Sequence, residues 1–451
     1  MSARPVISAV GTVLSYTENQ AATAIENVLS LTDADSPNIA GATVQITGNY
    51  ANGQDVLACP ACAGLGIGAV FTPATGLLTL SNTVAIAAYQ LALRSVTYVN
   101  TSEAPSTLGR TVTWSATDTD TNTSSLVTST INVTAVNDNP VLALGSAGIA
   151  FTEGNAATTL DSLLTVTDVD NANLTAATVS ITANVSSDDV LACPACAGQG
   201  IGVSFTSPTL TLTGNVAKAN YQTALRSVTY ANASQNPTTP TRTISWQLND
   251  GSGVNNLSAV VTSTIAVTAV NDAPVALAKA SAVQANMRRN GIDASLLAGV
   301  TDVDNGVNGC VSTSFSVANI GATVTNGTVF NVNLGAGTFD FEPAAGFTGT
   351  ATVSYTVSDT GCPGPAATSA PATISITVSG PVIWFVDDSA AGGGDGRLGR
   401  ELQTIGAATT AIGANTNQKI FVYSGTYTQG ASLNTDGWLI GQGTTGSFDT
   451  V

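Results

Sequence analysis

The sequence predicts an all-β protein built from tandem β-sandwiches, and three observations support this prediction. Thr, Val, Ser, Ala, Gly and Asn dominate the 451 residues, whereas charged residues make up only 9% of them. Thr and Val suit the pleated surface of a strand, and Gly and Asn suit turns. Runs of alternating apolar and polar residues recur between turn residues at roughly ten-residue spacing, as in β-sandwiches. Long segments of the chain also repeat, which indicates tandem domains.

The repeats define the first two predicted domains. DVLACPACAG at 55–64 recurs at 189–198, and VTSTINVTAVNDNPV at 127–141 recurs as VTSTIAVTAVNDAPV at 261–275, both at an offset of 134 residues. Two consecutive units of this length are therefore expected. The predicted domains are 1–137 and 138–272.

Alternation within these repeats predicts which side chains pack inside. Val112 and Trp114 fall on one face of a strand, and Ile244 and Trp246 fall on the equivalent face, so both tryptophans are expected in the core. Four arginines also recur, and we interpret them as structural, pairing with loop carboxylates or carbonyls. They are Arg94, Arg226, Arg110 and Arg242.

The second half of the chain changes character twice. Residues 273–379 keep the TDVDN motif at 301–305 but lack the cysteine motif of the repeats, which predicts a shorter, divergent sandwich. At Gly380-Pro381 the composition shifts, and short apolar strands flank a possible helix at 402–414. The segment 380–451 is therefore a fourth predicted domain.

Composition excludes several classes of function. The 12 Lys and Arg stand against 29 Asp and Glu, a net charge of −17, which excludes a nucleic-acid surface. No run of about 18 apolar residues is present, so no membrane span is predicted. The chain has no histidine, which excludes histidine-based acid–base catalysis and histidine-ligated zinc. No catalytic residues are predicted.

The acidic residues follow a pattern that suits a hard cation. A D-x-D motif occurs in each sandwich, an early Glu occurs in the first two, and an Asn-Asp-x-Pro joint ends each of these two. Carboxylates two apart on a loop can converge on one ion, and Ca²⁺ takes six to eight oxygen ligands. The alternative is that these residues only form Asx-turns. The D-x-D pairs are Asp33/Asp35, Asp168/Asp170 and Asp302/Asp304.

Together the early Glu, the D-x-D motif and the joint resemble the cadherin-type repeats of bacterial surface proteins. This resemblance covers roughly residues 5–380 and implies Ca²⁺ at the domain junctions. Asp33 and Asp35 would form half of a further site. The first implied site comprises Glu18, Asn137, Asp138, Asn139, Asp168 and Asp170, and the second comprises Glu153, Asn271, Asp272, Asp302 and Asp304. The chain departs from the cadherin joint at Ala135 and Ala269, where cadherins have Asp.

The six cysteines predict disulfides and an oxidising compartment. Cys59 with Cys62, and Cys193 with Cys196, form C-x-x-C pairs that allow a redox motif, a shared zinc site or a local disulfide. A local disulfide is favoured, because the strand–helix context of a redox motif is absent and the pairs lie in different domains. Cys310 and Cys362 are expected to pair across the third sandwich.

The last segment resembles the opening of right-handed parallel β-helices, as in pectate-lyase-like proteins and secreted adhesins. WFVDDS, a Gly-rich loop and IFVYSGTY carry the resemblance. A β-helix needs several stacked coils, and the N-terminus lacks a signal-peptide pattern, so the sequence is expected to be a piece of a longer protein.

Two functions are consistent with these features. The first is a non-enzymatic, extracellular structural or adhesive protein, stiffened by Ca²⁺, on a bacterial surface. Its expected partners are further copies of itself in a filament, through open sheet edges, or a cell-surface glycan or protein. The second is the spacer region and N-terminal part of a secreted β-helix polysaccharide lyase or hydrolase.

Overall fold

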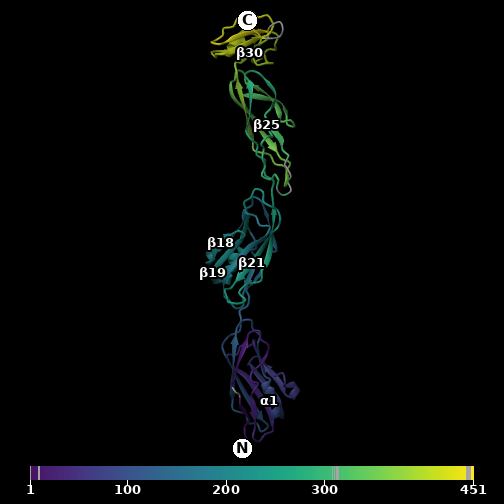
Figure 1. Cartoon of the computed structure of the whole chain (residues 1–451), viewed down its shortest axis with the longest axis vertical. Coiled ribbons are helices and arrows are strands. Elements are labelled where there is room, and N and C mark those ends of the chain that lie inside the picture. The colour runs from purple at the N-terminus through teal and green to yellow at the C-terminus, as the bar shows by residue number, and fades with distance from the viewer. Residues whose placement is uncertain are drawn as a thin grey trace.

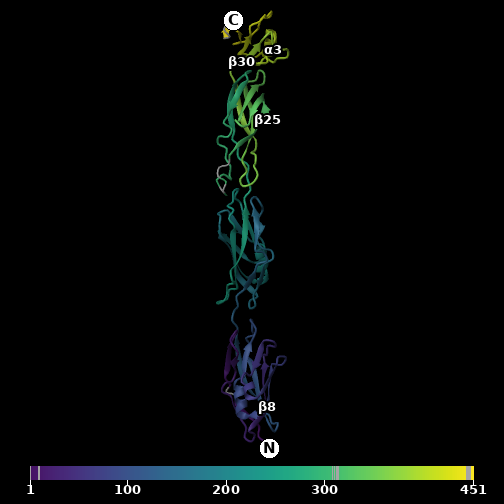
Figure 2. The ribbon, with the colours of Figure 1, turned by 90° about the vertical axis from the view of Figure 1, so that its right-hand side faces the viewer.

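The computed structural model describes residues 2–8, 11–306, 308, 310, 314–442 and the backbone of 448–450. The units follow one another end to end along one long axis, and the two termini lie at opposite ends (Figures 1 and 2). Nearly every element is a strand, so the predicted all-β tandem sandwich is confirmed.

In the first sandwich, a six-stranded sheet packs against two smaller sheets. The large sheet has the order β2-β11-β10-β5-β8-β7, with β2 parallel to β11, and the smaller sheets are β3-β9-β6 and β1-β4. The elements are β1 (Val6–Ser8), β2 (Val13–Thr17), β3 (Thr23–Ala24), β4 (Ser30–Thr32), β5 (Asn38–Gly48), β6 (Asp55–Ala58), β7 (Gly68–Thr72), β8 (Leu77–Ala85), α1 (Ile86–Arg94), β9 (Thr97–Asn100), β10 (Arg110–Asp118) and β11 (Val127–Thr134).

The second sandwich repeats this topology. Its sheets are β13-β22-β21-β16-β19-β18, β14-β20-β17 and β12-β15. The elements are β12 (Val141–Ala143), β13 (Gly148–Thr152), β14 (Thr158–Thr159), β15 (Thr165–Thr167), β16 (Asn173–Ala183), β17 (Asp189–Ala192), β18 (Gly202–Thr206), β19 (Thr209–Ala217), α2 (Lys218–Arg226), β20 (Thr229–Asn232), β21 (Arg242–Asn249) and β22 (Val261–Thr268). Short 3-10 helices lie at Ala63–Leu65 and Ala197–Gln199.

The third sandwich is smaller, with the sheets β23-β29-β28-β25 and β24-β27-β26. Its strands are β23 (Lys279–Gln284), β24 (Arg289–Asp293), β25 (Ser316–Thr325), β26 (Gly327–Asn333), β27 (Thr338–Pro343), β28 (Gly349–Ser358) and β29 (Ala372–Ser379). The C-terminal unit contains β30 (Val382–Val386), α3 (Ile405–Ile412), β31 (Gln418–Val422), β32 (Trp438–Gln442) and β33 (Phe448–Thr450).

Alternation decides which residues form the core. In β11 every second side chain is buried at Ser129, Ile131 and Val133. Trp114 of the large sheet and Tyr98 of the small sheet belong to one buried cluster, and Trp246 has the equivalent place in the second sandwich. The predicted packing of both tryptophans is therefore confirmed.

The repeated arginines are structural, as predicted. Arg94 Nε donates to the carbonyl oxygen of Leu29 at 2.6 Å, and Arg226 makes the equivalent bond in the second sandwich. Arg110 is completely buried and lies 3.2 Å from Asp55, and Arg242 pairs in the same way with Asp189. Each pair ties a strand of the large sheet to a strand of the small one.

The C-terminal unit forms a small parallel sheet in which β30, β31 and β32 lie in register. Thr404 caps α3, since its Oγ1 accepts from the backbone N–H of Ala407 at 3.1 Å. Parallel strands of this kind are consistent with a β-helix, but no closed coil is formed within the described residues. The predicted β-helix therefore stays a prediction.

Candidate metal centres at the domain junctions

The first junction lies between β11 and β12, where loops of both sandwiches meet. Glu18 follows β2, and because β2 runs parallel to β11 its backbone N–H donates to the carbonyl oxygen of Thr134 at 2.9 Å. The Glu18 carboxylate accepts from the backbone N–H of Val136 at 2.7 Å. On the other side, the Asp170 carboxylate accepts from the backbone N–H of Asp138 at 2.6 Å. Acidic side chains of both sandwiches therefore accept hydrogen bonds from the backbone of the linker.

Several carboxylate oxygens at this junction are buried without a hydrogen-bond partner. They are Glu18 Oε1, Asp138 Oδ2 and Asp168 Oδ2. The Glu18 and Asp168 residues are only 5% and 6% exposed. A buried polar atom without a partner costs about 1–3 kcal/mol, and more when it is charged. The junction thus presents oxygen donors that no group of the described chain satisfies.

A further carboxylate, that of Glu103, was missed by the sequence analysis. One oxygen each of Glu18, Glu103 and Asp138 lie within 4.8 Å of one another. Glu103 follows β9 on an exposed loop and also accepts from Asn19 Nδ2 at 3.1 Å. The equivalent residue of the second repeat is Gln235, so the comparison of repeats hides this acid. Its position in a loop shortly after a strand was the available signal.

Electrostatics at the first junction disfavour the charged carboxylates. Burial is the main cause that raises the pKa of Glu18; the hydrogen bond from Val136 opposes it, and the charges of Asp138 and Asp170 add to it. Burial followed by the charges of Asp170 and Glu103 also raises the pKa of Asp138. A cation placed among these groups would relieve both effects.

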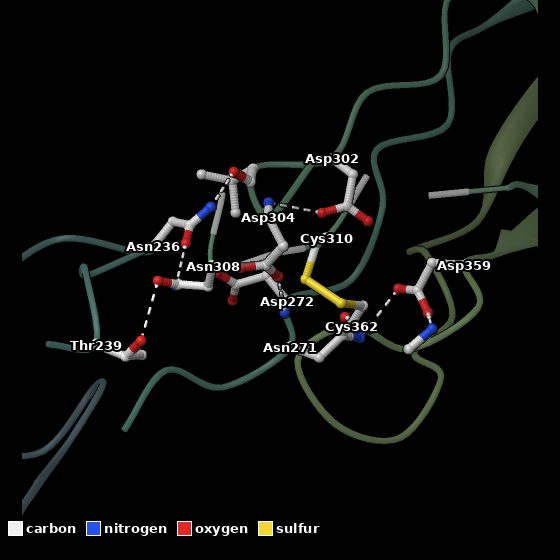
Figure 3. Close-up of a disulfide and its surroundings, with 12 residues drawn as sticks. Asn236, Thr239, Asn271, Asp272, Asp302, Asp304, Asn308, Cys310, Asp359 and Cys362 are labelled. Carbon is white, nitrogen blue, oxygen red and sulfur yellow. Dashed lines mark hydrogen bonds between the residues drawn. A yellow bond between two sulfur atoms is a disulfide. The ribbon is translucent and has the colours of Figure 1, made fainter. Parts of the chain in front are cut away.

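The second junction repeats this geometry, and Figure 3 shows its Asp272, Asp302 and Asp304. The Glu153 carboxylate accepts from the backbone N–H of Val270 at 2.8 Å, and Asp304 accepts from that of Asp272 at 2.6 Å. Burial, against the bond from Val270 and with the charges of Asp272 and Asp304, raises the pKa of Glu153. The buried oxygens without a partner are Glu153 Oε1, Asp272 Oδ2, Asp302 Oδ2 and Asp304 Oδ1.

Asn137, a predicted ligand, uses its side chain to hold the next sandwich. Its Nδ2 donates to Asp250 Oδ2 at 2.8 Å, and its Oδ1 accepts from Asn171 Nδ2 at 2.6 Å and from Ser252 Oγ at 2.8 Å. Asp250 was not singled out from the sequence, although it directly follows β21. The ligand role of Asn137 stays a prediction.

The other two joint asparagines also contact the following sandwich. Asn271 Nδ2 donates to Asp359 Oδ2 at 3.1 Å, and Asn271 Oδ1 accepts from the backbone N–H of Cys362 at 3.0 Å. Asn139 Nδ2 donates to the carbonyl oxygen of Leu257 at 2.7 Å. Asp359 occupies the position after β28 that Asp250 occupies after β21. The joints are therefore fixed mainly to the sandwich that follows them.

The N-terminal end of the first sandwich shows the same contact as the junctions. Asp35 Oδ2 accepts from the backbone N–H of Ala3 at 2.7 Å, as Asp170 does from Asp138. Asp33 Oδ2 is buried without a partner. These two acids match the D-x-D half of a junction, and their cation binding stays a prediction.

All six cysteines form disulfides. The pairs are Cys59–Cys62, Cys193–Cys196 and Cys310–Cys362, and no free cysteine remains. The prediction of local disulfides in the C-x-x-C motifs is thereby confirmed, as is the pairing in the third sandwich. The side chains gathered at the junctions are carboxylates, so the donors there are oxygens, which suit Ca²⁺.

Comparison with known families gives one result for the sequence. Residues 270–379 match the Cadherin-like domain family. This range begins at the second joint and contains the third sandwich, so the chain is a tandem β-sandwich protein whose third sandwich is cadherin-like. No curated protein sequence matches the chain.

Solved structures of low identity are also similar. A Drosophila N-cadherin fragment of domains EC1-3 is 11% identical, covers 82% of this chain and 97% of its own, and has a TM-score of 0.18. The cadherin-like domains 1 to 4 of zebrafish RET are 8% identical, and the match covers 81% of this chain and 71% of the RET chain with a TM-score of 0.21. The sialic acid binding region of a Streptococcus sanguinis adhesin is 11% identical, and the match covers 86% of this chain and 84% of the adhesin chain with a TM-score of 0.18. TM-scores of this size carry no argument about function.

The helices of the chain are short. Among the described residues, none is both long and apolar enough to cross a membrane.

Proposed function

We propose that this chain is a non-enzymatic extracellular rod whose first two junctions bind Ca²⁺, and that it serves as a structural or adhesive protein on a bacterial surface. The observation that carries the proposal is the set of buried junction carboxylate oxygens without a partner. Seven of these oxygens lie at the two junctions, and all belong to residues that the sequence pattern selected as ligands.

Calcium suits these sites better than other cations. The donors are carboxylates on loops, and Ca²⁺ accepts six to eight oxygens in flexible geometry. Zinc and copper sites are built mainly on nitrogen or sulfur donors, whereas the groups gathered at the first junction are carboxylates. Extracellular calcium modules bind with Kd of about 10⁻⁴–10⁻³ M, so the sites are expected to fill outside the cell.

Calcium at a junction would act mainly on shape. Each site includes a Glu from the preceding sandwich and a D-x-D pair from the following one, so an ion bound by both would connect the two sandwiches and would fix the angle between them where no other contact does. Glu18 and Asp170 already hold opposite sides of the first linker. The end-to-end arrangement in Figure 1 is the shape that such junctions would stabilise.

The cadherin-like third sandwich, the tandem repeats and the disulfides support an extracellular structural or adhesive role. Assembly into filaments is part of this proposal, since β7 and β18 are edge strands with exposed Val70 and Val203. The parallel strands β30, β31 and β32 favour one second candidate, a spacer leading into a secreted β-helix polysaccharide lyase or hydrolase.

Calorimetric calcium titration of the full chain tests the metal sites. The wild-type chain is expected to bind at both junctions, and Glu18→Gln is expected to remove binding at the first while Glu153→Gln removes it at the second. Asp436→Asn, at an exposed acid of the C-terminal unit, is the matched control and should bind like the wild type. Equal binding by the wild type and the Glu18→Gln/Glu153→Gln double variant would refute the proposal.

A further inference from the structure

The second junction has a set of direct contacts between its two sandwiches (Figure 3). Asn236 Nδ2 donates to the carbonyl oxygen of Val303 at 2.7 Å. Asn308 Nδ2 donates to Asn236 Oδ1 at 3.0 Å and to the carbonyl oxygen of Pro237 at 2.9 Å. Thr239 Oγ1 donates to Asn308 Oδ1 at 3.4 Å. These bonds join a loop of the second sandwich to a loop of the third without passing through the linker.

The first junction has different residues at the matching positions. Aligning TYVN at 97–100 with TYAN at 229–232 places Glu103 opposite Gln235 and Ala104 opposite Asn236. Within the described part of the chain, no hydrogen bond joins a loop of the first sandwich directly to a loop of the second. Glu103 and Ala104 at the first junction therefore correspond to two neighbouring amide residues, Gln235 and Asn236, at the second.

Asn308 lies two residues before Cys310, which a disulfide holds in place. β16 begins two residues after Asn171, whereas β25 begins eleven residues after the equivalent Asn305. Cys310 lies in this extra length and is bonded to Cys362. The backbone N–H of Cys362 also donates to Asn271 of the linker. The disulfide thus connects the chain beside Asn308 to the loop that holds the linker.

We propose that the second junction is an amide clamp, braced by the Cys310–Cys362 disulfide, that fixes the angle between the second and third sandwiches without a bound cation. Its contacts are bonds of neutral amides and a hydroxyl, which need no counterion. The disulfide limits the positions open to Asn308, which is two residues from Cys310. The contrast with a cation-dependent first junction rests on the proposed calcium function, whereas the clamp itself does not.

Distances between spin labels in the full chain test the clamp. Bio-orthogonal labels avoid the disulfide-bonded cysteines, and exposed strand positions Val70, Val203 and Val332 carry them, one on each sandwich. The Val203–Val332 pair spans the second junction, and the Val70–Val203 pair spans the first. In excess chelator we expect a narrow distance distribution for the second junction and a broad one for the first, with calcium narrowing only the first.

Substitutions separate the clamp from the metal sites. Asn236→Ala with Asn308→Ala, the former copying Ala104, is expected to broaden the Val203–Val332 distribution in chelator and to leave Val70–Val203 unchanged. Cys310→Ala with Cys362→Ala should do the same, whereas Cys59→Ala with Cys62→Ala should not. A broad wild-type distribution at the second junction in chelator, or a narrow one in both clamp variants, would overturn the proposal. A first junction indifferent to calcium would instead count against the calcium sites alone.

Discussion

Buried carboxylates occur inside the sandwiches and between them, and the two groups differ in their partners. Asp55, inside the first sandwich, accepts from Tyr98 at 2.6 Å and from Asn100 at 2.7 Å, and it pairs with Arg110 at 3.2 Å. Asp168, at the first junction, keeps one buried oxygen without a partner. The chain's own groups therefore satisfy Asp55, and this contrast is why we assign an external cation to the junctions.

The boundary before the C-terminal unit follows the interior pattern. Arg397, which is buried, lies 3.1 Å from Glu342 of the third sandwich and 2.6 Å from Asp395. The backbone N–H of Leu398 donates to the carbonyl oxygen of Asn286 at 3.0 Å. Apolar residues of the third sandwich and of the C-terminal unit also belong to one buried cluster. This boundary contains its own positive charge, so its geometry is expected to be independent of calcium.

The largest expected effect comes from removing an internal cation. Arg110→Met leaves Asp55 buried and unpaired, which should lower the free energy of unfolding of the first sandwich by about 3–5 kcal/mol. Denaturant unfolding in calcium and in chelator measures the loss, which should be equal in both. Arg400→Met, at a side chain 52% exposed, is the control and should change stability by less than about 1 kcal/mol. A loss that depends on calcium would break the comparison.

Removing a junction carboxylate should act only through calcium. At ten times its Kd, calcium adds about 1.4 kcal/mol to the stability of whatever it binds. Glu18→Gln should abolish this gain at the first junction, and in chelator it should not destabilise the chain, because it removes a buried charge whose pKa is raised. Thermal unfolding with and without calcium measures both. Strong destabilisation of Glu18→Gln in chelator would indicate that the chain already satisfies this carboxylate.

The pH dependence in chelator should distinguish the two groups of acids. The raised pKa values of Glu18, Asp138, Glu153 and Asp304 mean that the folded chain binds these protons at higher pH than the unfolded chain. The resulting stability is complete below the unfolded pKa values, with Glu at 4.5 and Asp at 3.8, and is lost as pH rises through the raised folded values.

Asp189 should behave in the opposite way. Burial alone would raise its pKa, but hydrogen bonds from Tyr230, Ser186, Asn232 and Arg242 lower it overall. Its contribution is present above the unfolded pKa and is lost as pH falls through the folded one. Unfolding midpoints in chelator should therefore rise as pH falls through the raised pKa values of the junction acids, and drop again once pH falls below the unfolded Asp value of 3.8 and Asp189 loses its contribution. The Glu18→Gln/Glu153→Gln double variant should show a smaller rise, and an unchanged rise would contradict the assignment.

The smallest expected effect concerns the exposed acid of the first junction. Glu103→Gln copies Gln235 and should weaken calcium binding at the first junction several-fold without abolishing it, since exposed charges contribute about 0.2–1 kcal/mol. Gln235→Glu should strengthen the second site by a similar factor. Calorimetric titration of the two single variants gives both affinities. If neither variant changes the calcium affinity, Glu103 is not a ligand of the first site.

Much of the fold and part of the site could be predicted because the sequence repeats. The alternation of apolar and polar residues predicted that Trp114 and Trp246 lie in the core, and the three-residue spacing predicted the disulfide between Cys59 and Cys62. The junction acids were found because Asp168/Asp170 and Asp302/Asp304 stand at equivalent places in consecutive domains.

The residues that were missed lie where the repeats differ or where contacts are distant in sequence. Glu103 becomes Gln235 in the second repeat, and Asn308 lies in a segment present only in the third sandwich. Arg397 meets Glu342 across two units, and nothing in the local pattern of either segment indicates that contact. The hydrogen-bond partner of a side chain also depends on residues that are distant in sequence. Asn137, for example, donates to Asp250 of the following sandwich.

Small-angle X-ray scattering of the full chain tests the central claim, that calcium fixes the angle at an acidic junction, most directly. With calcium, the account predicts the profile of a straight rod with the dimensions of the structure in Figure 2. With excess chelator, the maximum dimension should become broadly distributed while circular dichroism of the strands stays unchanged, because the sandwiches keep their cores. The Glu18→Gln variant should give the chelator profile even in calcium. Superposable wild-type profiles with calcium and with chelator would contradict the account.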